Sequence, residues 1–402
     1  MSVFSDVPKA PPDAILSASE GFEASTNPNK LNLGVGAYRT EEGKPLVLGV
    51  VKEAKRRILA DASQDHEYLI MGGIPEFCKL SALLAFGADS KALQEGRAAT
   101  IQCLSGTGSL RVGGEFLARF YSHKLVLTPT PSWANHKNIF ERCGLQTQGY
   151  RYYLPATRGL DYEGLIADLQ AAPEGAVVIL HACAHNPTGV DPTPEQWRGI
   201  LQAVQSRRLL PFFDSAYQGF ASGDLERDAA SIRMFADAGL EMLLAQSYAK
   251  NMGLYGERVG ALTVISSDAA AKKVESQLMA TARAMYSNPP KFGALLVTII
   301  LSDPELLAQW KVELKGMADR IHTMRRMLFD ALQEVGAPGS WNHVLEQIGM
   351  FSYTGLTEAQ VENMTTKWSV FMTRDGRISM AGLSGTKCKY LAEAIKDSVE
   401  NC

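Results

Sequence analysis

Residues 176–214 read AVVILHACAHNPTGVDPTPEQWRGILQAVQSRRLLPFFD. Two apolar runs, 176–180 and 209–213, flank a longer segment with a helical pattern, and this order is typical of a βαβ unit. Continuous apolar runs are expected of strands that helices cover on both faces. Pro211 interrupts the second run, and proline is tolerated at a sheet edge or at the start of a strand. The stretch predicts an α/β fold with a mostly parallel sheet.

The same alternation of apolar runs and helical patterns extends on both sides of this stretch. After about Pro304 it gives way to a long charged helical pattern, 306–332, and to strand-like pieces at 350–353 and 377–380. This change predicts a second, smaller domain. The other strand candidates of the first domain are 99–104, 124–127, 242–246 and 259–265.

Composition excludes several classes of protein. The chain has 402 residues with 40 Lys plus Arg against 43 Asp plus Glu, and it has no basic block, which argues against a nucleic-acid partner. Six separated cysteines without a CxxC pair argue against a disulfide framework or a zinc ribbon. The first 16 residues lack a signal-peptide core, and the apolar run 294–301 is too short for a membrane span. We expect a cytoplasmic protein with no membrane partner, although a mature organellar form would look the same.

Ligands of parallel sheets bind beyond the carboxyl ends of the strands. Ser105-Gly106-Thr107-Gly108 follows the run 99–104, and its small residues suit a phosphate at the start of a helix that we expect to begin near Ser109. It is not a Walker A loop, because no Gly-Lys-Ser/Thr follows. An ordinary strand-to-helix turn would have the same composition.

Two polar clusters follow the strands of the opening stretch. His181, Cys183 and His185 alternate as three metal ligands on one strand face would, but a fourth ligand is missing and hydrogen-bonded core histidines are more common. Asn186 precedes a proline, which favours an extended backbone and a projecting amide that could contact a ligand. Asp214 ends the next strand, where a carboxylate is costly to bury without a cation. The alternative for Asp214 is a helix N-cap.

Ser247 and Lys250 follow the run 242–246. A lysine among apolar neighbours can have a lowered pKa and form a Schiff base, although a surface lysine would fit the same sequence. Taken together, the strand ends offer a lysine, a carboxylate, amide and hydroxyl donors, and an anion cradle. Pyridoxal phosphate needs this combination, because it carries an aldehyde, a basic ring nitrogen, a phenolic oxygen and a phosphate. We therefore predict pyridoxal 5'-phosphate as the cofactor, with no metal.

A family resemblance rests on five stretches: 31–39 (LNLGVGAYR), 181–189, 212–223, 247–260 and 376–379. On these stretches the chain resembles the eukaryotic aspartate aminotransferases, within the class I, fold type I family of pyridoxal-phosphate enzymes. The resemblance implies a large cofactor-binding domain (45–316), a smaller α/β domain (15–44 with 317–402) and an N-terminal arm (1–14). It also implies that the small domain closes over a dicarboxylate.

The resemblance also implies roles in the chemistry. Lys250 would bind the cofactor aldehyde and carry the proton between the substrate α-carbon and cofactor C4'. Asp214 would pair with the pyridine nitrogen, and Tyr217 with Asn186 would hydrogen-bond the phenolic oxygen. His181 would support Asp214. The residues implied to hold the cofactor are Ser105, Gly106, Thr107, Trp133, Asn186, Asp214, Tyr217, Ser247, Lys250, Arg258 and Tyr68.

Substrate choice would depend on two arginines. Arg377, helped by the backbone of Gly36, would bind the α-carboxylate, and Arg283 would bind the distal carboxylate, since the guanidinium fork matches two oxygens. Trp133 and Asn186 would also contact the substrate. Arg283 and Tyr68 would act in the active site of the neighbouring subunit, which implies a homodimer.

The expected reaction belongs to amino-acid metabolism: L-aspartate and 2-oxoglutarate give oxaloacetate and L-glutamate, by a ping-pong path through pyridoxamine phosphate. Three departures from the animal enzymes, Tyr286 for Trp, Ala249 for Ser and Gly256 for Asn, resemble the plant or protist side of the family. Both Tyr and Trp can pack an arginine face, so a dicarboxylate preference is expected. The alternatives are a racemase, a β-lyase, a decarboxylase or an aromatic aminotransferase on the same site, or a non-catalytic or metal-binding protein.

Overall fold

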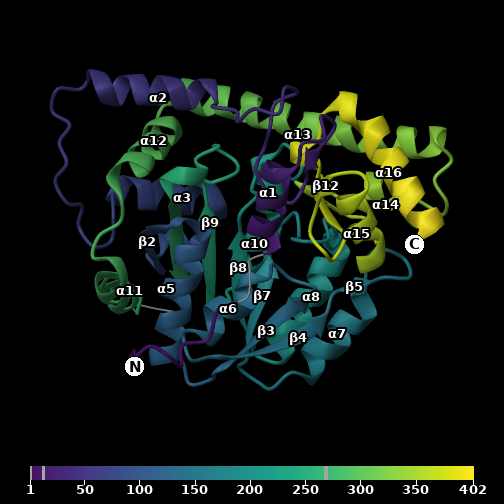
Figure 1. The fold of residues 1–402 in the computed structure, drawn as a ribbon. Helices are drawn as coiled ribbons and strands as arrows, with labels where there is room; N and C mark the ends of the chain where they lie inside the picture. The colour runs from purple at the N-terminus through teal and green to yellow at the C-terminus, as the bar shows by residue number, and fades with distance from the viewer. Residues whose placement is uncertain (1, 11–13, 267–269) are drawn as a thin grey trace. The chain divides into compact units, whose positions relative to one another are not determined.

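The computed structural model describes residues 2–10, 14–266 and 270–402, which form two compact units (Figure 1). The larger unit consists of Pro45–Thr323 and Glu346–Met350, and the smaller unit of Met1–Lys44, Met324–Leu345 and Phe351–Cys402. The division falls inside helix α13 (Pro304–Glu334). The domain limits implied by the resemblance differ from these units at 317–323 and 346–350, and they stay a prediction.

A seven-stranded sheet in the order β2-β10-β9-β8-β7-β3-β4 forms the centre of the larger unit. Every neighbouring pair is parallel except the two pairs of β10, which runs antiparallel to β2 and β9. The predicted α/β class and mostly parallel sheet are therefore confirmed. The strands are β2 (Ala98–Leu104), β3 (Leu125–Thr130), β4 (Gln146–Arg151), β7 (Val177–His181), β8 (Leu210–Ser215), β9 (Met242–Ser247) and β10 (Val259–Ile265).

Helices cover both faces of this sheet, which explains why its inner strands are apolar throughout. Phe212 packs on one face against Phe140 of α6, with ring centroids 5.9 Å apart. Phe213, the next residue of β8, packs on the other face against Phe235 of α10 at 5.1 Å. Pro211 is the second residue of β8, which lies between β7 and β9, so the proline is at a strand start and not at an edge.

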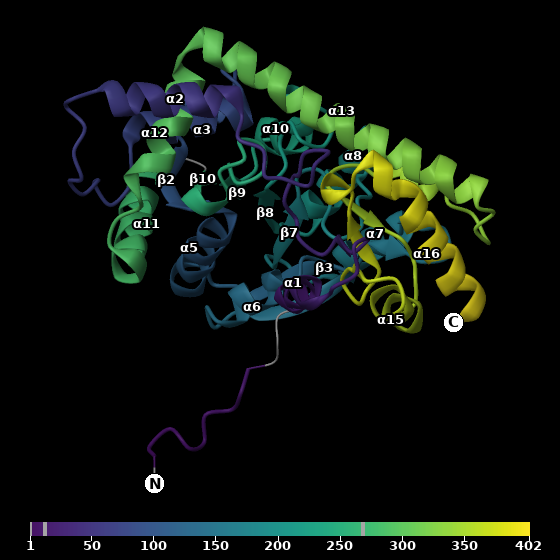
Figure 2. The ribbon, with the colours of Figure 1, turned by 45° about the horizontal axis from the view of Figure 1, so that its top comes forward.

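The helices of the larger unit include α11 and α12, which Figures 1 and 2 both place beside the β2 edge of the sheet. Two short strands, β5 (Tyr153–Leu154) and β6 (Gly159–Leu160), form a separate pair. The helices are α2 (Gly49–Ala60), α3 (Pro75–Phe86), α4 (Lys91–Gln94), α5 (Ser105–Phe120), α6 (Asn135–Glu141), α7 (Tyr162–Ala171), α8 (Pro194–Ser206), α9 (Leu225–Asp228), α10 (Ala230–Asp237), α11 (Ala271–Tyr286), α12 (Lys291–Ser302) and the 3₁₀ turn Tyr255–Glu257.

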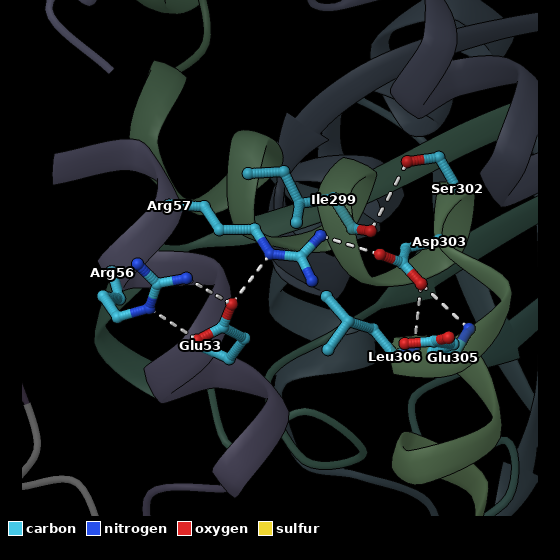
Figure 3. Close-up of polar contacts among 8 residues, drawn as sticks. All are labelled: Glu53, Arg56, Arg57, Ile299, Ser302, Asp303, Glu305 and Leu306. Atoms are coloured by element: carbon cyan, nitrogen blue, oxygen red, sulfur yellow. Dashed lines mark hydrogen bonds and ion pairs between the residues drawn. The ribbon is translucent and has the colours of Figure 1, made fainter. Parts of the chain in front are cut away.

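An ion-pair network ties α2 to the junction between α12 and α13 (Figure 3). Arg57 donates to Glu53 at 2.9 Å and to Asp303 at 2.7 Å. Asp303 also accepts the backbone N–H groups of Glu305 (2.8 Å) and Leu306 (3.1 Å), so it caps the start of α13. The Asp303 carboxylate thus has two roles: it pairs with Arg57 of α2, and it caps the N-terminus of α13.

The smaller unit contains two two-stranded sheets. β1 (Leu31–Asn32) pairs in parallel with β12 (Val370–Phe371), and β11 (Phe351–Tyr353) pairs antiparallel with β13 (Arg377–Ser379). β11 and β13 fall on the strand-like pieces that the sequence predicts. The helices of this unit are α1 (Ala14–Ala24), α15 (Glu358–Thr366), α16 (Cys388–Asn401) and two 3₁₀ turns (Met380–Gly382 and Gly385–Lys387); α14 (His343–Glu346) crosses a limit between the units.

Within the described ranges, no single helix has the length and apolar composition needed to cross a membrane; only the bent pair of α12 and α13 meets both criteria, by length and composition alone.

Candidate active site

Asp214 lies at the carboxyl end of β8, in the middle of the sheet. The register pairs Asp214 with His181 of β7 and with Ala245 of β9. No helix begins at Asp214, because the next helix, α9, is capped by Asp224. The N-cap alternative for Asp214 is therefore wrong, and the carboxylate is left for contacts with other groups at the sheet edge.

The partner of this carboxylate is His136, a residue that the sequence analysis did not consider. His136 of α6 is fully buried, and its Nε2 lies 2.9 Å from Asp214 Oδ2. Its Nδ1 lies 2.8 Å from the hydroxyl of Ser132, which in turn is 3.4 Å from His181 Nε2. His181 thus adjoins Asp214 through this chain of contacts. The signal that could have identified His136 is its place just after β3, at the same edge of the sheet.

The protonation of Asp214 follows from these contacts. Burial opposes the ionised form, but the hydrogen bond and the electrostatic effect of His136, with weaker effects of neighbouring groups that include Lys250, outweigh it, so the pKa of Asp214 lies below its ordinary value. Burial lowers the pKa of His181 well below its usual range, so that imidazole is neutral near pH 7. The site therefore holds an ionised carboxylate without a neighbouring imidazolium at His181.

The loop after β7 does not present three ligands on one strand face, because β7 ends at His181 and Cys183 and His185 lie beyond it. His185 stacks on Tyr152 with ring centroids 3.9 Å apart, and its Nδ1 lies 2.8 Å from Thr188 Oγ1. In the part of the chain that the structure describes, no three His, Cys, Asp or Glu residues come together as a metal site.

A cradle of donors opens at the end of β2. Helix α5 begins at Ser105 itself and not near Ser109 as the sequence analysis expects, because the strand passes directly into the helix through Leu104. Ser105 Oγ lies 2.8 Å from Ser247 Oγ of β9, and Gly106 and Thr107 occupy the first turn of α5. Hydroxyl and backbone N–H donors at a helix N-terminus suit an anion.

Close backbone packing makes this cradle possible. A Cβ atom on Gly260 would lie 2.3 Å from Gln246 O and 2.8 Å from Ser105 Cα, so no other residue fits without moving the backbone. A Cβ atom on Gly106 would lie 3.5 Å from Ser247 Cβ and 4.0 Å from Asp214 Oδ1. The open space at Gly106 thus faces both the hydroxyl pair and the carboxylate.

Lys250 lies in a turn that follows β9 and is half-buried. Its ammonium is 5.4 Å from the ring centroid of Tyr217, which is itself buried. The turn is held by the neighbouring Asn251, whose side chain donates to Gln218 O (3.1 Å) and whose carbonyl accepts from Trp310 Nε1 (2.8 Å). These contacts fix the backbone that carries the lysine.

Three other predicted residues lie near these groups or follow them in the chain. Trp133 packs edge-on against His136, with ring centroids 5.3 Å apart. Asn186 is buried, and its backbone N–H donates to His181 Nδ1 at 3.3 Å. Arg258 has a left-handed backbone (φ 50°) and donates to Tyr255 O at 2.8 Å.

The smaller unit contains Arg377, the predicted Gly36, and Gly34, which was not predicted as a site residue. Arg377 is 4% exposed, donates to Gly34 O at 2.8 Å, and stacks on the Phe351 ring at 4.1 Å from its centroid. A Cβ atom on Gly36 would lie 2.8 Å from the Phe351 ring, so this backbone must also be glycine for the ring to fit. The guanidinium is therefore held in one orientation.

Tyr68 and Arg283 belong to the larger unit but lie on its surface. Tyr68 is 83% exposed, and Arg283, in the last turn of α11, is also exposed. In a single chain, both side chains project into solvent.

The donor set fits the predicted pyridoxal phosphate. An ionised, buried carboxylate suits a protonated ring nitrogen, and the Ser105 and Ser247 hydroxyls with the first turn of α5 suit a phosphate. Lys250 is at the same end of the sheet. The residues present thus match the chemical groups of that cofactor one by one.

Comparison with known proteins gives the family. The family model described as "Aminotransferase class I and II" matches residues 28–395. Cytoplasmic aspartate aminotransferase of Oryza sativa subsp. japonica is 58% identical over 99% of this chain and 98% of its own length. Chloroplastic aspartate aminotransferase 3 of Arabidopsis thaliana is 57% identical over 98% of this chain and 88% of its own length.

Solved structures agree with these relatives. Aspartate aminotransferase from the cytoplasm of Saccharomyces cerevisiae superposes with a TM-score of 0.97 at 42% identity, covering 99% of this chain and 98% of that chain. An aromatic-amino-acid aminotransferase of Burkholderia pseudomallei, covalently bound to pyridoxal phosphate, superposes with a TM-score of 0.96 at 41% identity, covering 99% of this chain and all of that chain.

Proposed function

We propose a function for this chain on the premise that it belongs to the family of class I and II aminotransferases. The chain is a pyridoxal-phosphate-dependent transaminase that converts L-aspartate and 2-oxoglutarate into oxaloacetate and L-glutamate. The observation that carries this function is the ionised Asp214 beside the Ser105–Ser247 cradle, in a chain 58% identical to an aspartate aminotransferase.

The cofactor would be held at both of its charged ends. Ser105, Gly106, Thr107, Ser247 and Arg258 would bind the phosphate, and Asp214 would bind the ring nitrogen. Trp133 would pack over the ring, and Tyr217 and Asn186 would donate to the phenolic oxygen. When bound, pyridoxal phosphate supplies an electron-withdrawing ring that stabilises negative charge on the substrate α-carbon.

The protein supplies the proton transfer. We assign Lys250 as the group that would take the proton from the substrate α-carbon and deliver it to carbon C4' of the cofactor. His136 keeps Asp214 ionised and oriented through the 2.9 Å hydrogen bond. The contacts of Asn251 hold the backbone turn that carries Lys250. The lysine side chain therefore extends from a fixed position toward the substrate α-carbon and cofactor C4'.

Two arginines would select the substrate. Arg377, fixed by Gly34 O and by the Phe351 ring, would bind the α-carboxylate together with the backbone of Gly36. Arg283 would bind the distal carboxylate of aspartate or glutamate. Because Arg283 and Tyr68 are exposed in the single chain, we propose a homodimer in which each subunit supplies these two side chains to the active site of the other.

The compartment belongs to the same proposal. We propose the cytoplasm, in line with the cytoplasmic relative from rice, whereas the Arabidopsis relative is named as chloroplastic. Fractionation of the source cells with an antibody against this chain tests the assignment, and recovery in the organelle fraction would contradict it.

An absorption spectrum of the purified protein, before and after addition of L-aspartate, tests the function. We expect a visible band that L-aspartate converts to a near-ultraviolet band and that 2-oxoglutarate restores. Product analysis with L-aspartate alone separates a transaminase, which stops after one half-reaction, from a racemase or a lyase, which continues. A protein without a visible band after addition of pyridoxal phosphate would contradict the proposal.

The role of Arg283 gives a prediction about specificity. Arg283→Leu should lower kcat/KM for aspartate by about tenfold to somewhat more than a hundredfold, because the distal carboxylate loses a charge-assisted hydrogen bond worth about 1.5–3 kcal/mol. The kcat/KM for phenylalanine should change little. Steady-state kinetics with both amino acids measure the two effects, and equal losses would show that Arg283 does not bind the distal carboxylate.

The same assay tests the second candidate function, transamination of aromatic amino acids, which the likeness to the Burkholderia pseudomallei enzyme favours.

A further inference from the structure

Arg283 is held by the two residues that follow its helix. Its Nη1 donates to Ser287 Oγ at 2.5 Å and lies 3.5 Å from Asn288 Oδ1. The Ser287 hydroxyl donates in turn to Asn288 Oδ1 at 2.7 Å. An exposed arginine normally samples many rotamers, and ordering it costs conformational entropy. These three side chains restrict that freedom before any substrate arrives.

The backbone that presents these groups is strained. Ser287 has φ 68° and ψ −72°, and the N–H of Asn288 donates to Tyr286 O at 2.8 Å, which closes a three-residue γ-turn. A residue other than glycine rarely adopts this conformation, and such strain is found mainly at sites where the surrounding structure enforces it. The turn places the Asn288 side chain in contact with both Arg283 and the backbone of Leu69.

Asn288 reaches from this turn to the segment that carries Tyr68. Its Nδ2 donates to Leu69 O at 2.5 Å. Residues 61–74 between α2 and α3 contain no helix or strand, and this side-chain contact adds to the backbone hydrogen bonds that order them. The hydrogen bond to Leu69 is adjacent to Tyr68 in the chain. One amide therefore contacts Arg283 with its oxygen and the Tyr68 segment with its nitrogen.

Gln102 forms a second bridge between the same two segments, the turn 286–291 and the Tyr68 segment (65–74). This residue of β2 is fully buried; its Nε2 donates to Pro290 O at 2.7 Å, and its Oε1 accepts from the N–H of Ile74 at 3.2 Å. Its backbone N–H also donates to Gly72 O at 2.8 Å. A Cβ atom on Gly73 would lie 2.2 Å from Gln102 Cβ, so the segment follows the strand closely.

We propose that Asn288 and Gln102 are positioning residues that lock the Tyr68 segment (65–74) and the turn 286–291 into one rigid unit, so that this unit presents Arg283 to the distal carboxylate of the substrate and Tyr68 to the cofactor in the active site of the neighbouring subunit. This inference rests on the proposed function. It makes the specificity for dicarboxylates depend on two uncharged amides that do not themselves bind the substrate.

Asn288→Ala tests the first bridge. We expect kcat/KM for aspartate to fall about tenfold to a hundredfold, as misplacement of a binding group by about 1 Å can cause, while kcat/KM for phenylalanine changes less than about twofold. Hydrogen exchange of the holoenzyme should be faster in residues 65–74. In an Arg283→Leu background, Asn288→Ala should cause no further loss with aspartate, because the two residues act as one unit.

Asn363→Ala is the matched control. Asn363 also donates from its side chain to two acceptors, Asp397 (3.0 Å) and Ser398 (2.9 Å), but it belongs to the smaller unit. Its removal should leave the ratio of the two kcat/KM values unchanged. Gln102→Glu tests the second bridge, because it retains the acceptor for the Ile74 N–H and loses the donor to Pro290 O. Like Asn288→Ala, it should lower the ratio of kcat/KM for aspartate to kcat/KM for phenylalanine.

Two results would overturn the inference. One is an additive loss in the Arg283→Leu, Asn288→Ala double variant, and the other is an equal loss for aspartate and phenylalanine with unchanged hydrogen exchange in residues 65–74. If Gln102→Glu does not fold, the comparison of Asn288→Ala, Arg283→Leu and the double variant still tests the inference. A wild-type protein that fails to transaminate aspartate would instead refute the proposed function, which is tested before any variant is made.

Discussion

Two carboxylates, Asp214 at the carboxyl end of β8 and Asp191 in the loop before α8, have pKa values shifted in opposite directions for reasons visible in their contacts. Asp214 has a histidine partner and a pKa below its ordinary value. Asp191 accepts the backbone N–H groups of Ala184 (2.6 Å) and His185 (2.8 Å), and desolvation raises its pKa to about 6. These two backbone donors lower the pKa of Asp191 by less than the loss of water raises it.

For Asp214 this contrast predicts a large loss of catalysis in Asp214→Asn. The neutral amide cannot hold a protonated ring nitrogen, and loss of one member of a buried ion pair costs about 3–5 kcal/mol, equal to about two to four orders of magnitude in kcat. The measurement is kcat at saturating pyridoxal phosphate, with bound cofactor quantified. A variant that retained wild-type kcat with cofactor bound would show that Asp214 does not pair with the ring.

For Asp191 the raised pKa predicts a pH effect on stability. The folded protein binds this proton more tightly than the unfolded chain does, so the contribution is present below about pH 4 and is lost as pH rises to about 6. The shift of about two units corresponds to about 3 kcal/mol. The free energy of unfolding of wild type, relative to Asp191→Asn, should therefore fall by up to this amount between pH 4 and pH 7. A difference independent of pH would contradict the assignment.

Helix α8 begins with a capping box that the sequence PTPEQ (192–196) encodes directly. Thr193 Oγ1 accepts the N–H of Gln196 at 3.2 Å, and Gln196 Oε1 accepts the N–H of Thr193 at 2.9 Å. Thr193→Ala should destabilise the protein by about 1 kcal/mol, whereas Thr193→Ser should retain most of the cap. Urea unfolding of the three proteins measures this, and an Ala variant as stable as the Ser variant would contradict it.

Elements were predictable where burial dictates their composition. The six largely apolar strands of the sheet were all predicted, because helices cover both faces and burial there favours apolar residues. Strand β4, with the sequence QTQGYR, was missed because it is the outermost strand and its side chains are largely exposed. The start of α5 was placed four residues late, because its first turn is rich in glycine and lacks a side-chain cap.

The candidate site was partly predictable for a related reason. Ser105, Asp214, Ser247 and Lys250 follow predicted strands directly, so their convergence at one edge follows from the topology. His136 was missed because it meets Asp214 across 78 residues of chain, from a short helix that no periodicity identifies. The bridges of Asn288 and Gln102 depend on backbone carbonyls, which leave no trace in the sequence pattern.

At the scale of the whole molecule, the exposure of Arg283 and Tyr68 predicts complementation between inactive variants. In a homodimer with shared sites, a Lys250→Ala subunit supplies an intact Arg283, and an Arg283→Leu subunit supplies an intact Lys250. Mixed dimers then contain one complete site. Random assortment of equal amounts gives half mixed dimers, and therefore about a quarter of wild-type activity toward aspartate.

The measurement is aspartate turnover after the two purified variants are unfolded together and refolded, with each variant refolded alone as the control. Wild type refolded in the same way corrects for yield, and phenylalanine turnover reports how many Lys250 sites survive. If Arg283 acted within its own subunit, every site in the mixture would lack either the lysine or the arginine, and aspartate activity would stay at the level of the separate variants. Recovery of aspartate activity therefore depends on the arginine of one chain reaching the lysine of another, and its absence from a mixture shown to contain mixed dimers would refute the shared site.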